Sequence, residues 1–234
     1  MIRAVLFDVD FTLVRPGPEL SPEGYRRLGE RHGLTLDPAA YDGARHAALD
    51  SLQHHPELEH DDEIWVAFTE RIVNGMGGHG PAAHAAAREM VAFWEVHTNF
   101  ELYEDALPVL DVLRAHELKI ALISNTARDL SEFVAHHRLH VDAALASRAH
   151  GKTKPHPSIF EAVLAQLGVD PDEAAMVGDS PADDIEGARG LGMAAFLLDR
   201  EGRYPDAEGR LTDLYALPAA LGLEPSSAGS TRTP

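Results

Sequence analysis

Residues 2–13, with the sequence IRAVLFDVDFTL, decide the fold that we expect for this chain. The run from Ala4 to Phe7 is short, apolar and partly β-branched, which is typical of a buried parallel strand. Asp8 and Asp10 follow at the point where this strand would leave the sheet. Ligands of open α/β sheets bind at the carboxyl ends of the strands, and side chains two residues apart on an extended chain point the same way. Because two such carboxylates repel each other, the pattern predicts a bound cation or a shared proton.

Three further polar segments follow candidate strands or lie in loops near them. Ser124–Asn125 and Gly178–Asp179 each follow an apolar run, and the acidic pair Asp183–Asp184 comes shortly after the second. Lys154 precedes a proline in the intervening loop. This chain has only three lysines, and two of them lie within residues 151–155, which suggests a need for a compact ammonium group there.

Strand and helix patterns alternate from about residue 99 onward, which predicts an α/β fold. Its core would be a Rossmann-like parallel sheet flanked by helices, with right-handed crossovers. The expected strands are 119–124, 143–146, 174–177 and 194–198, and the expected helices are 106–116, 128–138, 157–167 and 181–190.

The segment between the first strand and residue 99 has helical patterns throughout. Ser21 and Asp37 each precede a proline, as an N-cap precedes a proline at the first helical position. About four helices inserted after one strand are too many for a simple loop. We therefore expect an all-helical cap domain over residues 15–98. The catalytic core would then comprise residues 1–14 and 99–223, and residues 224–234 would form a disordered tail.

Composition excludes several classes of function. The formal charge of −18 argues against general binding to nucleic acid or a membrane surface, both of which require basic patches. The absence of cysteine excludes disulfides and thiolate sites. The N-terminus enters a strand without a signal peptide, and no apolar run approaches transmembrane length, so we expect a cytoplasmic protein. The sequence leaves its oligomeric state open between a monomer and a homodimer.

The four polar segments resemble, in the same order, the four motifs of the haloacid dehalogenase-like hydrolase superfamily. The core motifs are specific, whereas the cap resembles the insertions of many members only in size, position and helical character. The resemblance implies that Asp8 is a nucleophile that forms an aspartyl-phosphate, and that Asp10 acts first as general acid and then as general base. Ser124, with the amide of Asn125, would bind a phosphoryl oxygen, and Lys154 would neutralise charge on the transferring group.

The resemblance also implies a Mg²⁺ cofactor, which favours oxygen ligands and phosphate. The expected metal site comprises Asp8, the backbone carbonyl of Asp10, Asp179 and Asp184. Spacing alone allows either Asp183 or Asp184 to hold the metal's waters or to position Lys154, and residues 185–188 favour Asp184.

The backbone amides of Val9 and Phe11 are expected as further phosphate donors. Phe11 departs from the family pattern, which often has glycine at this position. If the turn requires a positive φ, phenylalanine is costly there. We interpret its side chain as packing on the substrate side or the cap side of the loop.

The function expected from these residues is a Mg²⁺-dependent phosphatase that hydrolyses a small phosphorylated metabolite. A phosphomutase would use the same groups, and a non-catalytic binding protein could share the fold. Haloacid dehalogenases have no aspartate at the position of Asp10 and need no metal. The combination of Asp10, Asp179 and Lys154 therefore favours phosphoryl transfer over dehalogenation.

Overall fold

The computed structural model describes residues 1–223, and its core is a six-stranded parallel sheet. The strand order is β5-β4-β1-β6-β7-β8. The strands are β1 (Ala4–Phe7), β4 (Lys119–Ser124), β5 (Ala143–Ala146), β6 (Ala174–Gly178), β7 (Ala194–Leu198) and β8 (Arg210–Leu211). The predicted Rossmann-like α/β core is confirmed. The predicted disordered tail, residues 224–234, lies outside the described residues.

The central strand β1 explains why the first apolar run is continuous. It pairs with β4 on one side and β6 on the other, and all four of its residues are buried. Val5 and Phe7 pack into one hydrophobic cluster, while Ala4 and Leu6 pack into the other. A strand that is buried on both faces needs apolar side chains at every position.

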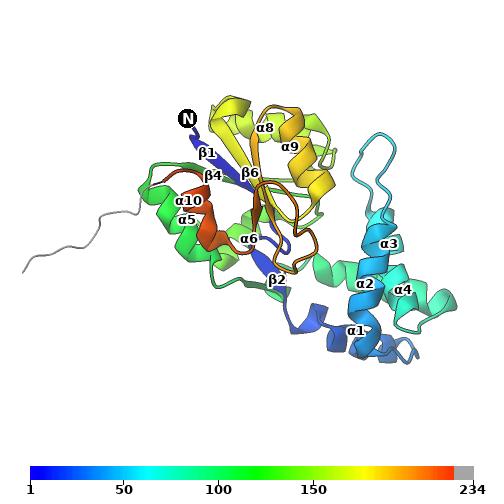
Figure 1. Ribbon diagram of the computed structural model, residues 1–234. Helices are drawn as coiled ribbons and strands as arrows, with labels where there is room; N and C mark the ends of the chain where they lie inside the picture. Colours follow the sequence, from blue (N-terminus) through cyan, green and yellow to red (C-terminus); the bar gives the residue numbers. More distant parts are fainter. Residues whose placement is uncertain (224–234) are drawn as a thin grey trace, which may run out of the picture.

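Helices cover both faces of the sheet (Figure 1). One face packs against α5 (Ala106–Ala115), α6 (Leu130–His137) and α10 (Leu217–Ala220). The other packs against α8 (Pro157–Leu167) and α9 (Gly187–Gly190), and a short helix α7 (Ser147–His150) follows β5. Helix α6 begins two residues later than expected, because the Asp129 side chain accepts hydrogen bonds from the amides of Ser131 and Glu132 and thereby caps the helix.

Four other helices form a separate group beyond the end of the sheet at which β1 terminates (Figure 1). They are α1 (Pro22–Arg31), α2 (Tyr41–Asp50), α3 (Asp62–Gly75) and α4 (Gly80–Trp94). Ser21 caps α1 through the amide of Gly24, and Asp37 caps a 3₁₀ turn that leads into α2. That turn is Pro38–Ala40, and further 3₁₀ turns span Pro18–Leu20, His97–Asn99, Pro171–Glu173 and Leu214–Ala216.

A two-stranded antiparallel ribbon carries the chain out to these helices and back. It pairs β2 (Val14–Pro16) with β3 (Phe100–Leu102). Neither strand is expected from the sequence, because three residues are too few for a periodic signal. The ribbon requires a close approach at Gly17, where a Cβ atom would lie 2.8 Å from the carbonyl oxygen of Asn99. The boundary predicted between core and cap falls in or beside these two strands.

No helix among residues 1–223 combines the length and the apolar character that crossing a membrane requires.

The last residue of α6 gives the fold an acid-sensitive group. The ring of His137 lies 4.5 Å from that of Phe133, and its Nε2 is buried without a hydrogen-bond partner among the described residues. Burial, assisted by the neighbouring His136, lowers the pKa of His137 to about 4 from 6.5. The unfolded chain therefore binds a proton more readily, and stability falls as the pH drops from 6.5 towards 4.

We expect the free energy of unfolding, measured by urea denaturation, to fall less between pH 7 and pH 5 in His137→Leu than in the parent. The control His140→Leu replaces an exposed histidine and should keep the parent's acid sensitivity. Equal acid losses in the parent and in His137→Leu would contradict this assignment.

Candidate active site

Lys154 joins two of the predicted site carboxylates in the interior of the protein. Its Nζ donates to Asp8 Oδ1 at 2.5 Å, to Asp184 Oδ1 at 2.7 Å and to the carbonyl oxygen of Ile123 at 3.0 Å. An ammonium group has three N–H donors, so all three are used. Lys154 is 2% exposed and Asp8 7%, which makes this a buried, fully hydrogen-bonded ion cluster.

Asp184, rather than Asp183, belongs to this cluster because of an irregular helix after β6. The segment Pro181–Glu186 forms a π-helix, in which the amide of Ile185 donates to the carbonyl of Ser180 five residues earlier. The predicted helix over 181–190 is present with these bounds, but Pro181–Glu186 is a π-helix and only α9, Gly187–Gly190, is α-helical. The π-helix directs Asp184 inward, where Oδ2 accepts a hydrogen bond from the Ser180 amide at 3.0 Å. Asp183 instead lies 3.0 Å from His54 Nε2.

Asp179 completes a group of three carboxylates that suits a divalent cation. One oxygen each from Asp8, Asp179 and Asp184 lie within 4.8 Å of one another. Opposite ligands of an octahedral Mg²⁺ ion are about 4.2 Å apart, and Mg²⁺ prefers carboxylate oxygens. Three ionised carboxylates beside the single ammonium of Lys154 leave an excess of two negative charges. The donor set and its charge both fit Mg²⁺.

Burial and mutual repulsion perturb the acid–base properties of these groups. Burial raises the pKa of Asp8 to about 7, with Asp184 and Asp10 adding to the rise while Lys154 opposes it. Burial and the nearby Asp8 likewise raise the pKa of Asp179. Burial alone would lower the pKa of Lys154, but Asp184 and Asp8 hold it above its ordinary value. Lys154 therefore remains an ammonium, and the carboxylates favour any further cation that offsets their charge.

The second motif supports the lysine loop. Ser124 is the last residue of β4 and is buried. The side chain of Asn125 donates from Nδ2 to the carbonyl oxygen of Lys154 at 3.0 Å, and its Oδ1 accepts from the Lys154 amide at 2.7 Å. These two hydrogen bonds fix the backbone that carries the lysine.

The turn after Asp8 differs in part from the sequence expectation. The amide of Phe11 donates to the carbonyl oxygen of Val14 at 2.7 Å, so this N–H is not available to a phosphate, against the prediction. The carbonyl of Val9 also closes the turn, by accepting from the amides of Leu13 and Val14 at 2.9 and 3.1 Å. Because the turn needs the left-handed region, Phe11 has a φ of 62°.

The Phe11 ring packs towards the four-helix group, as the cap-side interpretation predicted. Its centroid lies 6.0 Å from the ring of Trp94 in α4 and 4.9 Å from the guanidinium carbon of Arg45 in α2. Helices far along the chain from Asp8 thus contact the loop that carries the first motif.

Sequence reasoning missed Arg128, which binds the second aspartate. Its Nη1 and Nη2 donate to Asp10 Oδ1 and Oδ2, each at 3.1 Å. Nothing in the spacing of Arg128 distinguishes it from the sixteen other arginines of the chain, and only the folded protein brings it to Asp10.

Comparisons with known proteins agree with this geometry. The family model described as haloacid dehalogenase-like hydrolase matches residues 2–192. The chain belongs to this family of hydrolases. It is 35% identical to phosphoserine phosphatase of Thermus thermophilus over 233 residues, and the alignment covers 88% of this chain and 92% of that protein. It is 32% identical to glyceraldehyde 3-phosphate phosphatase of Methanopyrus kandleri, and the alignment covers 91% of this chain and 90% of that protein.

A solved structure shows the same architecture. The 2-haloacid dehalogenase of Pseudomonas syringae is 26% identical, has a TM-score of 0.61, and aligns over 95% of this chain and 99% of its own. Phosphatases and dehalogenases of this family thus share one fold, so the distinction between the two reactions depends on individual residues.

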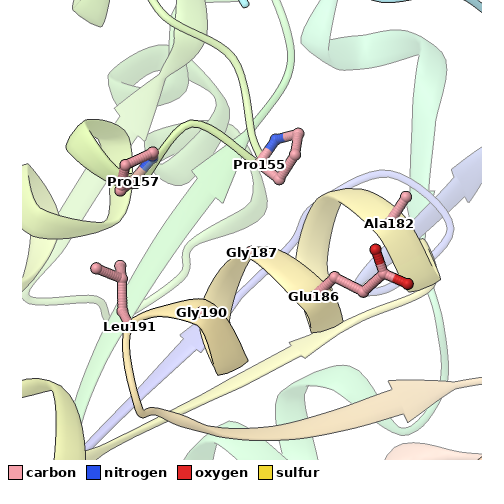
Figure 2. Close-up of a pocket in the computed structure, with 7 residues that line it drawn as sticks. All are labelled: Pro155, Pro157, Ala182, Glu186, Gly187, Gly190 and Leu191. Atoms are coloured by element: carbon pink, nitrogen blue, oxygen red, sulfur yellow. The ribbon is translucent and has the colours of Figure 1, made fainter.

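A surface cavity of about 350 Å³ is lined by the residues drawn in Figure 2. Pro155, Ala182, Glu186 and Leu191 are among its lining residues, on the outer side of the π-helix and α9. None of the predicted catalytic or metal-binding residues lines it, so we do not assign the chemistry to this cavity.

Gly178, the last residue of β6, leaves room for Asp184. A Cβ atom on Gly178 would lie 2.1 Å from Asp184 Oδ2 and 2.7 Å from Asp184 Cβ, far inside contact distance. We expect Gly178→Ala to displace Asp184 from Lys154 and to lower both the melting temperature and turnover. Gly190→Ala is the control, because a Cβ there meets nothing within 4 Å. A Gly178→Ala variant as stable and active as Gly190→Ala would contradict the requirement.

Proposed function

We propose that this hydrolase is a Mg²⁺-dependent phosphatase that acts on a small phosphate monoester through an aspartyl-phosphate. One observation carries the proposal: the buried ammonium of Lys154 holds Asp8 at the end of β1, beside the acidic residues that follow β6. A nucleophilic carboxylate, a fixed cation and an oxygen-rich metal site are the groups that transfer of an anionic phosphoryl group requires.

In the first half-reaction, the Asp8 oxygen that is not bonded to Lys154 attacks phosphorus, and the bond from phosphorus to the leaving oxygen breaks. Asp10 gives its proton to that oxygen, which leaves as an alcohol. In the second half-reaction, a water molecule attacks the aspartyl-phosphate and gives a proton to Asp10. The bond between Asp8 and phosphorus breaks, which restores the carboxylate and releases phosphate.

The remaining groups hold charge in place during both half-reactions. Ser124 donates its hydroxyl to a phosphoryl oxygen, and Lys154 neutralises charge on the transferring group and on Asp8. Asp8, Asp179, Asp184 and the carbonyl of Asp10 would hold Mg²⁺ directly or through water. When bound, the metal offsets the charge of the carboxylates and of the phosphate.

Two observations favour this reaction over dehalogenation and define the substrate class. Displaced halide needs no proton, whereas an alkoxide does, and Asp10 lies beside the cluster as a candidate acid. The two relatives named above are phosphatases named for small phosphorylated metabolites. The four-helix group, which contacts Phe11, would act as a cap that selects the leaving group and excludes water.

The test is phosphate release from a panel of small phosphorylated metabolites, with Mg²⁺ and with EDTA. We expect turnover of at least one phosphate monoester with Mg²⁺, its loss in EDTA, and its recovery when Mg²⁺ is restored. Halide release from 2-haloacids in EDTA would point to dehalogenation. Conversion of a hexose 1-phosphate to its 6-phosphate without net hydrolysis would point to a phosphomutase.

A further inference from the structure

Arg128 makes more contacts than a simple partner of Asp10 would need. Besides the two hydrogen bonds to Asp10, its Nε and Nη2 donate to the carbonyl oxygen of Trp94 at 3.2 and 3.0 Å. Four of the five N–H groups of the guanidinium are therefore engaged. Its side chain is 1% exposed, so it contacts protein on all sides.

The carbonyl of Trp94 belongs to the last residue of α4, where the helix returns to the core. Carbonyl groups in the last turn of a helix lack intrahelical partners, and a cation nearby also compensates the helix dipole. The guanidinium carbon of Arg128 lies 3.9 Å from the ring centroid of Phe100 in β3 and 5.4 Å from that of Phe133 in α6. Arg128 is thus fixed by the end of α4, the returning strand and the core.

Asp10, by contrast, lies on a turn and has a side chain that is 23% exposed. Within residues 1–223, the side-chain hydrogen bonds of its carboxylate come from Arg128 alone. A two-pronged guanidinium contact sets both the position and the plane of a carboxylate, which a single donor does not.

We propose that Arg128 is a positioning residue, which orients the carboxyl group of Asp10 for proton transfer to the leaving oxygen and links that orientation to the seating of α4. This inference rests on the proposed phosphatase function and on the role of Asp10 as its general acid. Misplacing a reacting group by about 1 Å typically costs on the order of 10²-fold in rate, so an unanchored Asp10 should be a poor acid.

The test compares the turnover of p-nitrophenyl phosphate, whose leaving group needs little protonation, with that of an alkyl phosphate. Asp10→Asn should lower kcat for the alkyl ester much more than for the p-nitrophenyl ester. Arg128→Gln should likewise lower the ratio of kcat for the alkyl ester to kcat for the p-nitrophenyl ester, with kcat for the alkyl ester falling roughly 10–100-fold. The double variant should lose little beyond Asp10→Asn, because both changes remove one function. Arg128→Lys keeps the charge without the fork and should fall between Arg128→Gln and the parent.

Arg200 offers a matched control. It makes the same kind of two-pronged contact with Asp105, at 2.9 and 2.8 Å, and donates to the carbonyl of Thr12 at 2.9 Å. Its guanidinium carbon also lies 3.8 Å from an aromatic ring, that of Tyr103. Arg200→Gln therefore removes an equivalent set of contacts and should lower the melting temperature without changing the ratio between the two esters.

Equal losses for both esters in Arg128→Gln, or losses that multiply with those of Asp10→Asn, would overturn the proposal and leave Arg128 a purely structural role. A faster Arg128→Gln enzyme would also overturn it, since Arg128 would then restrain the acid. A crystal structure of Arg128→Gln is a test that does not depend on turnover. In it, the Asp10 side chain should leave its present orientation. Absence of phosphate release from the parent would refute the proposed function, while this structure would still decide whether Arg128 orients Asp10.

Discussion

Asp8→Asn should lower kcat for phosphate release by at least about 10⁴-fold while the protein keeps its fold. The amide is nearly the same size as the carboxylate, and its oxygen still accepts the hydrogen bond that Lys154 Nζ now donates to Asp8 Oδ1. The negatively charged oxygen that attacks phosphorus is lost, and an uncharged amide is a very weak nucleophile. The loss should therefore appear in kcat for good and poor leaving groups alike.

The same substitution should not destabilise the metal-free protein. Burial and the nearby acids raise the pKa of Asp8 to about 7, so its charged form is disfavoured in the folded state. Asparagine removes that charge and relieves repulsion with Asp179 and Asp184. We expect a melting temperature in EDTA equal to or above that of the parent, measured by circular dichroism.

Asp183→Asn is the matched control for this experiment. Asp183 is the neighbour of Asp184 in the chain but lies beside His54, outside the carboxylate cluster. We expect it to keep most of the parental turnover. Retention of several per cent of parental activity in Asp8→Asn, with Asp183→Asn inactive, would require a different nucleophile.

The elements that the sequence predicted are those whose signals are local. A buried central strand must be apolar at every position, so Ala4–Phe7 revealed β1 and hence the edge at which Asp8 lies. Helix caps such as Ser21 and Asp37 are likewise visible in the residues themselves: Ser21 caps α1, and Asp37 caps the 3₁₀ turn that leads into α2.

The features that the sequence did not reveal depend on contacts between distant segments. The role of Arg128 arises only because residues 10, 94 and 128 converge in space. The π-helix Pro181–Glu186 places Asp184 against Gly178, and no periodicity in residues 181–190 predicts this departure from an α-helix. Phe11 was the one local clue, because an unusual residue at a turn indicated packing against another part of the chain.

Lys154→Met should have the largest combined effect on stability and turnover. Methionine preserves the unbranched apolar stem but removes the ammonium and its three hydrogen bonds. Asp8 and Asp184 are then buried without their cation, a change that typically costs about 3–5 kcal/mol of unfolding free energy. Loss of the fixed positive charge beside the transferring group should also lower kcat by roughly 10²–10³-fold or more.

Lys152→Met is a control within the same loop. Its Nζ donates to the carbonyl of Glu57 at 2.8 Å and lies 3.5 Å from Glu59, at the surface. Exposed ion pairs contribute about 0–1 kcal/mol, so this variant should unfold nearly as the parent does and keep its turnover. Urea denaturation and phosphate release for the two variants, in parallel, separate the buried ammonium from the exposed one.

Adding Mg²⁺ distinguishes a structural cation from a catalytic one. A divalent ion among Asp8, Asp179 and Asp184 would offset the charge that Lys154→Met leaves uncompensated, so Mg²⁺ should recover part of the lost melting temperature. It should not recover turnover, because the position of the ammonium between Asp8 and Asp184 would still lack a donor. If Lys154→Met proved as stable and as active as Lys152→Met, the buried ammonium would not be the group that balances these carboxylates.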